Sequence, residues 1–115
     1  MNLEEITAKI RRFRDERDWA QFHNPKDMAM ALSIEAGELM ELFLWKTPDE
    51  ADAVVQEKRE KIEEEVADVA IYLVELADLL GIDLFAAMER KMEKNAAKYP
   101  ADLVKGSSKK YDEYP

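Results

Sequence analysis

The sequence contains no cysteine, only three glycines and four prolines, and a single histidine. Without cysteine the chain has neither a disulfide framework nor a thiolate site, which suits a reducing compartment. The scarcity of glycine and proline leaves long uninterrupted segments, and 47% hydrophobic with 37% charged residues favours a folded helical protein over a disordered one. The 115 residues suffice for one domain, and we expect about residues 100–115 to be an extended C-terminal tail.

The chain also lacks a long hydrophobic run, and we expect no signal peptide. No apolar segment approaches the roughly 20 residues that span a bilayer, and the N-terminus is acidic at Glu4 and Glu5. We therefore expect a soluble cytoplasmic protein. The formal net charge of −9 disfavours binding to a nucleic-acid polymer or an anionic membrane, because both would be repelled at long range. A small polyanion that binds together with a metal ion is compatible with this net charge.

Hydrophobic residues recur at three- and four-residue spacing in several segments, which predicts an all-α fold. Asn24 followed by Pro25 is a helix start signal, and Gly81 and Asp83 end one helix and cap the next. Thr47 begins a further short helix. The helices are predicted over residues 3–17, 25–45, 48–55, 62–80 and 84–98, with an aromatic loop after the first.

Two of these predicted helices carry a pair of carboxylates inside an apolar stripe. At 100° per residue, Glu35 and Glu38 lie on the apolar line of their helix. Glu65 and Asp68 repeat the arrangement on a line with Tyr72, since residues two turns apart drift by only about 20°. Solvated acids are not expected at such positions.

The two acidic stretches, residues 27–45 and 62–89, contain no lysine or arginine, so we expect no ion-pair partner within either helix. Burying unpartnered carboxylates costs several kcal/mol each, and four acids meeting between two helices therefore call for a divalent cation. Ligation by oxygen alone favours Mg²⁺, with Mn²⁺ as a substitute. The predicted metal ligands are Glu35, Glu38, Glu65 and Asp68.

Two other interpretations of the acids stay open. An acidic pair spaced by three is weak evidence by itself, because such pairs occur on many solvated helices. A di-iron bundle would need Glu-x-x-His pairs, and the single histidine, His23, lies in a loop outside such spacing. A non-catalytic helical module, whose acidic stripes pair with a basic partner, is the remaining alternative.

Basic and aromatic side chains could complete a nucleotide site. Lys91, Lys94 and Lys98 share a helical face and could reach phosphate oxygens, or could simply suit the helix dipole. The aromatic candidates for stacking on a base are Trp19, Phe22, Trp45 and Tyr72, with core packing as the alternative. We expect Trp45 and Tyr72 near the ligand, and Phe13 and Phe85 in the core.

Several runs resemble the MazG-like all-α nucleoside triphosphate pyrophosphohydrolases, and among these the dCTP pyrophosphatase branch. The runs include Glu-Ala-Gly-Glu-Leu-Met-Glu-Leu-Phe-Leu-Trp-Lys (35–46) and Glu-Glu-Val-Ala-Asp-Val-Ala-Ile-Tyr-Leu (64–73). Others cover residues 16–23, 91–95, 98–100 and 105–111, so the resemblance spans nearly the whole chain in order. It implies a MazG-like four-helix bundle that assembles as a dimer or a dimer of dimers, with the active site at a subunit interface.

The function implied is Mg²⁺-dependent hydrolysis of a nucleoside triphosphate, dCTP or a modified dCTP, to the monophosphate and pyrophosphate. A broad-specificity house-cleaning pyrophosphatase is the alternative. We expect Glu35 and Glu38 to be catalytic, with Glu38 accepting a proton from water. The expected nucleotide contacts are Trp19, His23, Trp45, Tyr72, Lys91, Asn95, Lys98, Lys110 and Tyr111. One departure concerns the base: animal relatives carry a histidine nine residues before the loop tryptophan, where this chain has Ile10.

Overall fold

A computed structural model describes residues 1–114, and over that range the chain is all-α without a strand. Two compact units are present, Met1–Gly81 and a second that begins at Ile82. The α-helices are α1 (Leu3–Glu16), α2 (Pro25–Glu41), α3 (Pro48–Glu57), α4 (Arg59–Leu79), α5 (Leu84–Lys98) and α6 (Ala101–Val104). Short 3₁₀ turns lie at Ala20–Phe22 and Tyr111–Glu113. Within the described residues, no helix combines the length and the hydropathy that crossing a bilayer requires.

The helix starts predicted from capping residues are confirmed. The side-chain oxygens of Asn24, Thr47 and Asp83 accept backbone N–H groups three residues later, at 2.9, 3.2 and 3.1 Å. Each bond satisfies a donor that the first turn of a helix leaves unpaired. Gly81 follows α4 with a φ of 65°, the left-handed conformation that suits glycine at a helix end.

Two helix boundaries differ from the prediction by three or more residues. The helix expected to reach Trp45 ends at Glu41, because the next N–H groups bond to carbonyls three residues back and Trp45 adopts a left-handed φ of 63°. The helix expected from Ile62 begins at Arg59, so it contains Lys61. The tail also holds more regular structure than expected, with α6 and a 3₁₀ turn after α5.

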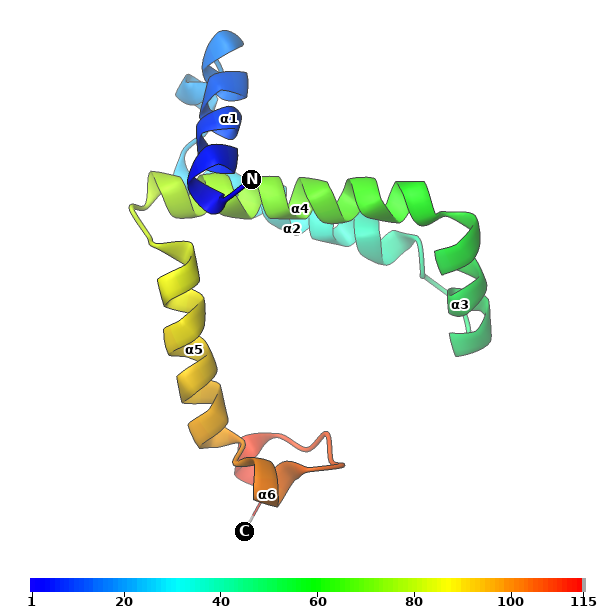
Figure 1. Cartoon of the computed structure of the whole chain (residues 1–115). Helices are drawn as coiled ribbons and strands as arrows, with labels where there is room; N and C mark the ends of the chain where they lie inside the picture. The colour runs from blue at the N-terminus through cyan, green and yellow to red at the C-terminus, as the bar shows by residue number, and fades with distance from the viewer. Residues whose placement is uncertain (115) are drawn as a thin grey trace. The chain divides into compact units, whose positions relative to one another are not determined.

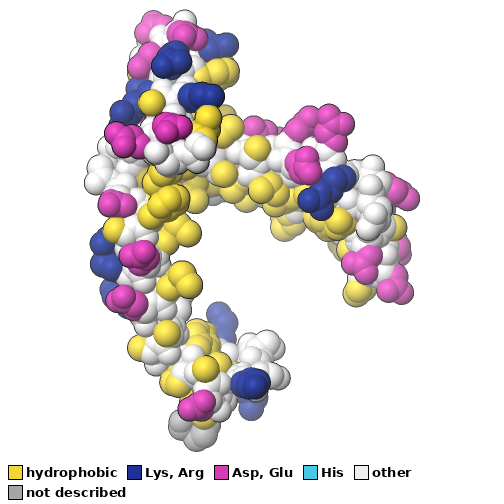
Figure 2. Space-filling view, in the orientation of Figure 1, with side chains coloured by type: hydrophobic (Ala, Val, Ile, Leu, Met, Phe, Trp, Pro, Cys, Tyr) yellow, Lys and Arg dark blue, Asp and Glu magenta, His cyan; other side chains and the backbone are white. Residues whose placement is uncertain are grey.

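The first unit is organised around α2 and α4, which run antiparallel along each other, while α1 and α3 each pack on α4 (Figure 1). Few apolar side chains are enclosed by this arrangement. The buried hydrophobic residues among those described are Ile10, Met28, Val54 and Ala77. Many others stay exposed, and hydrophobic side chains line the α2 and α4 pair in Figure 2.

Candidate functional site

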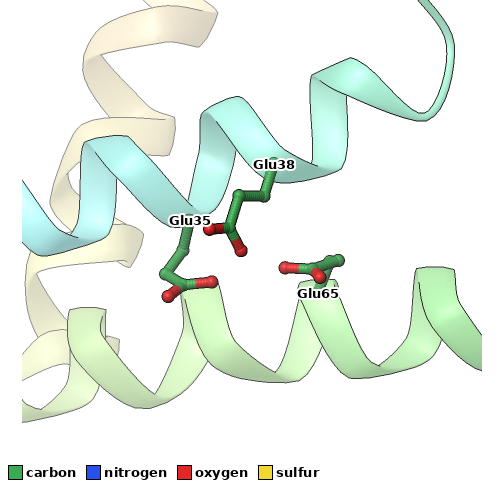
Figure 3. A group of neighbouring side chains, drawn as sticks. All are labelled: Glu35, Glu38 and Glu65. Carbon is green, nitrogen blue, oxygen red and sulfur yellow. The ribbon is translucent and has the colours of Figure 1, made fainter.

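The acidic residues of α2 and α4 meet across the seam between the two helices. Glu35 and Glu38 project from α2 toward Glu65 of α4, and Figure 3 shows the three carboxylates pointing at one another. One oxygen from each lies within 4.8 Å of the others. The three-residue spacing places the two α2 acids on one face, and the antiparallel pairing brings that face onto α4. The predicted convergence of these three acids is therefore confirmed.

Asp68 lies one turn beyond Glu65 on α4 and lines the same cavity as Glu35. The four acids differ in burial: Glu65 is buried, Glu35 is half-buried, and Glu38 and Asp68 are exposed. The expectation that all four lie inside an apolar interface is thus wrong for the last two. Their exposure leaves an open side through which a ligand can approach.

Two carboxylate oxygens of the cluster are buried without a hydrogen-bond partner among the described residues. They are Glu35 Oε2 and Glu65 Oε2. An orphaned buried acceptor is costly, and native structures rarely leave one without water, an ion or a ligand. Hard oxygen donors that converge in this way fit a divalent cation such as Mg²⁺ or Mn²⁺.

A lysine already serves one of these acids. Lys61 Nζ lies 2.8 Å from Glu65 Oε1, one turn earlier on the same helix. Its hydrogen bond and charge lower the pKa of Glu65. The prediction that neither helix supplies its own cation is therefore wrong for Glu65, because α4 starts three residues earlier than the sequence pattern indicated.

Glu35 shows the effect of the crowded negative charge most clearly. Burial raises its pKa to about 7, and its neighbours Glu38, Asp68 and Glu65 add to the rise. Desolvation and like charges both disfavour the ionised carboxylate. In the absence of a cation, the cluster therefore retains a proton close to neutral pH, and a divalent ion would favour its release.

A cavity of about 500 Å³ opens beside the acids. Its walls come from α1, the aromatic loop, α2 and α4. Glu35 and Asp68 form its acidic end, while Phe13, Trp19, His23 and Tyr72 supply aromatic surface. The Phe13 and Trp19 rings meet edge to face at 5.9 Å, and the Trp19 and His23 rings lie 6.1 Å apart.

Three of the residues expected to contact the nucleotide, namely Trp19, His23 and Tyr72, are brought to this cavity. The expectation that Phe13 and Phe85 lie in the core is wrong, since they are 52% and 56% exposed, and Phe13 lines the cavity instead. Trp45 does not line it: the side chain is 91% exposed, beyond the end of α2. Extrapolating the helical line to Trp45 failed because the helix had already ended.

The other expected nucleotide contacts belong to the second unit. There, Lys98 Nζ lies 4.8 Å above the ring of Tyr111, which also meets Tyr99 edge to face at 6.3 Å. These contacts join the end of α5 to the segment around Tyr111. The nucleotide-binding role of Lys91, Asn95, Lys98, Lys110 and Tyr111 stays a prediction from sequence.

A polar network that the sequence pattern did not predict lies at the other end of the cavity. His23 Nδ1 lies 2.6 Å from Glu75 Oε1, and Arg14 Nη1 lies 3.9 Å from the same oxygen. Glu75 is 4% exposed, and all three residues line the cavity. A seven-residue step from Asp68 places Glu75 on the same line of α4, so the spacing could have marked Glu75 as a candidate, although not its partners His23 and Arg14.

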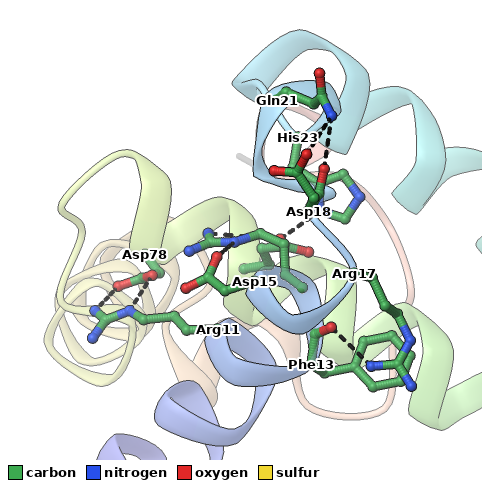
Figure 4. Close-up of polar contacts among 10 residues, drawn as sticks. Arg11, Phe13, Asp15, Arg17, Asp18, Gln21, His23 and Asp78 are labelled. Carbon is green, nitrogen blue, oxygen red and sulfur yellow. Dashed lines mark hydrogen bonds and ion pairs between the residues drawn. The ribbon is translucent and has the colours of Figure 1, made fainter.

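A separate ion pair joins α1 to α4 one turn further on. Arg11 Nε donates to Asp78 Oδ2 at 2.7 Å, and Arg11 Nη2 donates to the other carboxylate oxygen (Figure 4). This bidentate pairing lowers the pKa of Asp78. Neither residue lines the cavity, so the pair holds α1 in place without entering the site.

Comparison with known proteins places this arrangement in a family. The model of the MazG-like family matches residues 30–114, which include all four candidate metal ligands. The chain belongs to the MazG-like family. It is similar to human dCTP pyrophosphatase 1, with 46% identity over 115 residues that cover 98% of this chain and 68% of the relative. The mouse protein of the same name is 44% identical over the same shares.

A solved structure agrees with this MazG-like assignment. The chain is similar to a pyrophosphatase from Archaeoglobus fulgidus, with a TM-score of 0.81 and 46% identity, over 84% of this chain and 91% of that one. MazG-like pyrophosphatases generally depend on a divalent metal, and the carboxylate cluster of this MazG-like chain provides oxygen ligands for such an ion.

Proposed function

We propose that this MazG-like protein is a Mg²⁺-dependent nucleoside triphosphate pyrophosphohydrolase. Its substrate would be dCTP or a modified dCTP, cleaved between the α and β phosphorus atoms to the monophosphate and pyrophosphate. Relatives named dCTP pyrophosphatase, 43 to 46% identical over nearly the whole chain, support this activity. The observation that carries it is the meeting of the acid cluster with an aromatic cavity, since Glu35 belongs to both.

The acids would act as ligands and as a base. Glu35, Glu38, Glu65 and Asp68 would hold Mg²⁺, which supplies positive charge to the phosphate oxygens and makes water more acidic. Glu38 is the most accessible acid of the convergent three and would take the proton from the attacking water. Glu35 is the second candidate for this role, because its raised pKa lies near the working pH.

The aromatic end of the cavity would receive the base. Trp19 and Tyr72 offer rings that can pack against it, and burial with the charges of Glu35, Asp68 and Glu75 raises the pKa of the Tyr72 hydroxyl, so it stays a hydrogen-bond donor. The phosphates would then lie toward the acids and the metal. This orientation uses both ends of the cavity.

We also propose that the protein acts as a homodimer or homotetramer. Large hydrophobic side chains on α2 are exposed in the single chain, for example Met30 at 56%, Ile34 at 61% and Met40 at 65%. A self-contained small protein rarely leaves so much apolar surface in water. Light scattering coupled to size exclusion would test this, and a monomer at micromolar concentration would contradict it.

The activity is tested by incubating the protein with dCTP and Mg²⁺ and separating the products by ion-exchange chromatography. We expect dCMP and pyrophosphate in equal amounts, and no reaction when EDTA replaces Mg²⁺. Release of dCDP and orthophosphate would contradict α,β cleavage.

Broad specificity is the second candidate function, because stacking on aromatic rings tolerates every base. Trp19, Phe13 and Tyr72 make much of the cavity surface aromatic. A panel of dCTP, dUTP, dTTP and 5-substituted dCTP would separate the two. Similar kcat/KM values across the panel would favour the house-cleaning role, and a preference for cytosine would favour the dedicated enzyme.

A further inference from the structure

We propose that Glu75 is a positioning residue that selects the base through His23. By holding the proton on Nδ1, Glu75 leaves Nε2 of His23 as a hydrogen-bond acceptor in the cavity, which favours a base with an exocyclic amino group over one with a keto group. This inference rests on the proposed function and adds to it the residues that distinguish cytosine from uracil and thymine.

The hydrogen bond between His23 and Glu75 determines where the imidazole carries its proton. Nδ1 lies 2.6 Å from Glu75 Oε1, a short hydrogen bond between a ring nitrogen and a carboxylate oxygen. An ionised carboxylate can only accept, so Nδ1 must be the donor. Arg14 approaches the same oxygen, with its Nη1 at 3.9 Å from Glu75 Oε1. A neutral imidazole with its proton on Nδ1 has a lone pair on Nε2.

The second ring nitrogen of His23 is available to a ligand. Over residues 1–114, no hydrogen bond engages Nε2, and the His23 side chain lines the cavity at 16% exposure. Glu75, at 4% exposure, is too enclosed to serve a substrate itself. A base packed against Trp19 would present its edge to His23, because the two rings lie 6.1 Å apart on the same cavity wall.

The position of this pair suits the base end of a nucleotide. Glu75 follows Asp68 by seven residues on α4, a separation of about 10 Å along the helix axis. The acids that would hold the metal and phosphates therefore lie at one end of the cavity, and the His23 and Glu75 pair lies at the other. A nucleoside triphosphate that spans the cavity meets both.

The chemical distinction follows from which atoms the bases present. Cytosine carries an amino donor where uracil and thymine carry a keto acceptor. A lone pair on Nε2 accepts from the amino group, whereas it faces a second lone pair in the keto bases and leaves both unpaired. One such contact is worth about tenfold in kcat/KM.

The tautomer can be measured without turnover, because His23 is the only histidine in the chain. Long-range ¹H–¹⁵N correlation spectra at pH 8.5 would show a single imidazole. We expect a neutral ring with its proton on Nδ1 in the wild type, and a shift toward the Nε2-protonated form in Glu75→Ala. A wild-type ring protonated on Nε2 or on both nitrogens, or a tautomer that Glu75→Ala does not change, would overturn the inference.

A double-mutant cycle tests whether Glu75 acts through His23. We expect Glu75→Ala and His23→Ala each to lower the ratio of kcat/KM for dCTP over dUTP by about tenfold, and the double variant to lower it no further. The loss should appear in KM for dCTP, with kcat and the Mg²⁺ half-saturation unchanged. Additive losses in the double variant would show that Glu75 acts independently and would refute the proposal.

Two further variants serve as controls for this experiment. Asp78→Ala breaks another ion pair between α1 and α4 outside the cavity, so it should lower thermal stability and leave the ratio unchanged. Glu75→Gln keeps the side-chain volume if Glu75→Ala does not fold. An amide can donate as well as accept, so it does not require Nδ1 to be the donor. Glu75→Gln should therefore also lower the ratio of kcat/KM for dCTP over dUTP, and an unchanged ratio would count against the inference.

The outcomes separate this inference from the proposed function. A wild-type protein that hydrolyses no triphosphate refutes the proposed function, and base selection fails with it, while the tautomer is still measured. A wild-type protein that hydrolyses dCTP, with a ratio that Glu75→Ala does not move, refutes this inference alone.

Discussion

The acids in the two halves of α4 lie in opposite electrostatic environments. Glu75 and Asp78, toward the C-terminal end, face the arginines of α1, and Glu75 is also hydrogen-bonded to His23. Glu65 and Asp68, toward the N-terminal end, lie near Glu35 and Glu38 of α2, where Lys61 is the one cation bonded to the cluster among the described residues.

This difference separates structural charges from functional ones. Where the protein supplies a counter-charge, the acid is stabilised by the fold: the pKa of Asp78 is lowered by Arg11. Where the protein supplies no counter-charge, as at Glu35, the pKa of the acid rises because its ionised form is destabilised. An acid cluster that its own chain compensates only at Glu65, through Lys61, is complementary to a positive ligand.

The largest expected effect comes from replacing one acid in each half of α4. Asp68→Asn should lower turnover of dCTP at least about 100-fold and keep the fold, because it weakens metal ligation without removing an ion pair. Asp78→Asn should keep turnover and lower the melting temperature, since it leaves Arg11 unpaired. Chromatographic assays and thermal denaturation would measure both, and an active Asp68→Asn enzyme would contradict the assignment.

Mg²⁺ should stabilise the acidic end of α4 and thereby the whole protein. At a concentration 100 times its Kd, a ligand bound only by the native state adds about 2.7 kcal/mol to the free energy of unfolding. Differential scanning fluorimetry with and without Mg²⁺ would measure the shift, with Asp68→Asn as a control that should respond less. A melting temperature that Mg²⁺ leaves unchanged would favour the non-catalytic helical module.

The raised pKa of Glu35 predicts how Mg²⁺ binding depends on pH. Because its carboxyl must lose a proton to bind a cation, the Mg²⁺ affinity should rise about tenfold per pH unit up to about pH 7 and level off above it. Isothermal titration calorimetry in two buffers of different ionisation enthalpy would also report the proton released. Glu35→Gln removes the group and should flatten the profile, and a flat wild-type profile would contradict this account.

The same pKa fixes the sign of a stability effect in the metal-free protein. The native pKa of about 7 lies above the ordinary value of 4.5, so the native state holds this proton more tightly than the unfolded state. The stability that the proton contributes is complete below about pH 4.5 and is lost as the pH rises through 7. Urea denaturation in EDTA at pH 5 and pH 8, with Glu35→Gln as reference, would measure it.

The smallest expected effect concerns Lys61, which competes with a metal ion for Glu65. Lys61→Met should tighten Mg²⁺ binding by about twofold, because the exposed ammonium is screened by solvent. Arg59→Met is the matched control: it breaks the pair with Glu63 on the same helix, away from the cluster. Equal changes in the two variants would show that net charge, rather than the contact with Glu65, sets the affinity.

The sequence predicted the features that depend on local periodicity. Helix caps such as Asn24 and Asp83 act within three residues, and the acids Glu35, Glu38 and Glu65 interrupt an apolar line of period 3.6. Both signals are contained in a single helix turn or two. The all-α fold and the convergence of the acids could therefore be predicted before any tertiary contact was known.

The predictions that failed depended on where helices begin and end, and on contacts between residues far apart in the sequence. A shift of three residues at the start of α4 hid Lys61, and a shift of four at the end of α2 misplaced Trp45. Element boundaries are the least certain part of a sequence pattern. The bond between His23 and Glu75 joins residues 52 apart, and no local spacing encodes it.

The acid cluster also has a mechanical consequence. Glu35 and Glu38 belong to one helix and Glu65 to the other, so an ion shared by them would cross-link α2 and α4 at a place where their own charges push them apart. Amide hydrogens of both helices near this seam would exchange faster once a chelator removed the ion. The metal site would in this way also hold α2 and α4, the two longest helices, together. Loss of the ion would therefore loosen the contact between these helices first at the acid cluster.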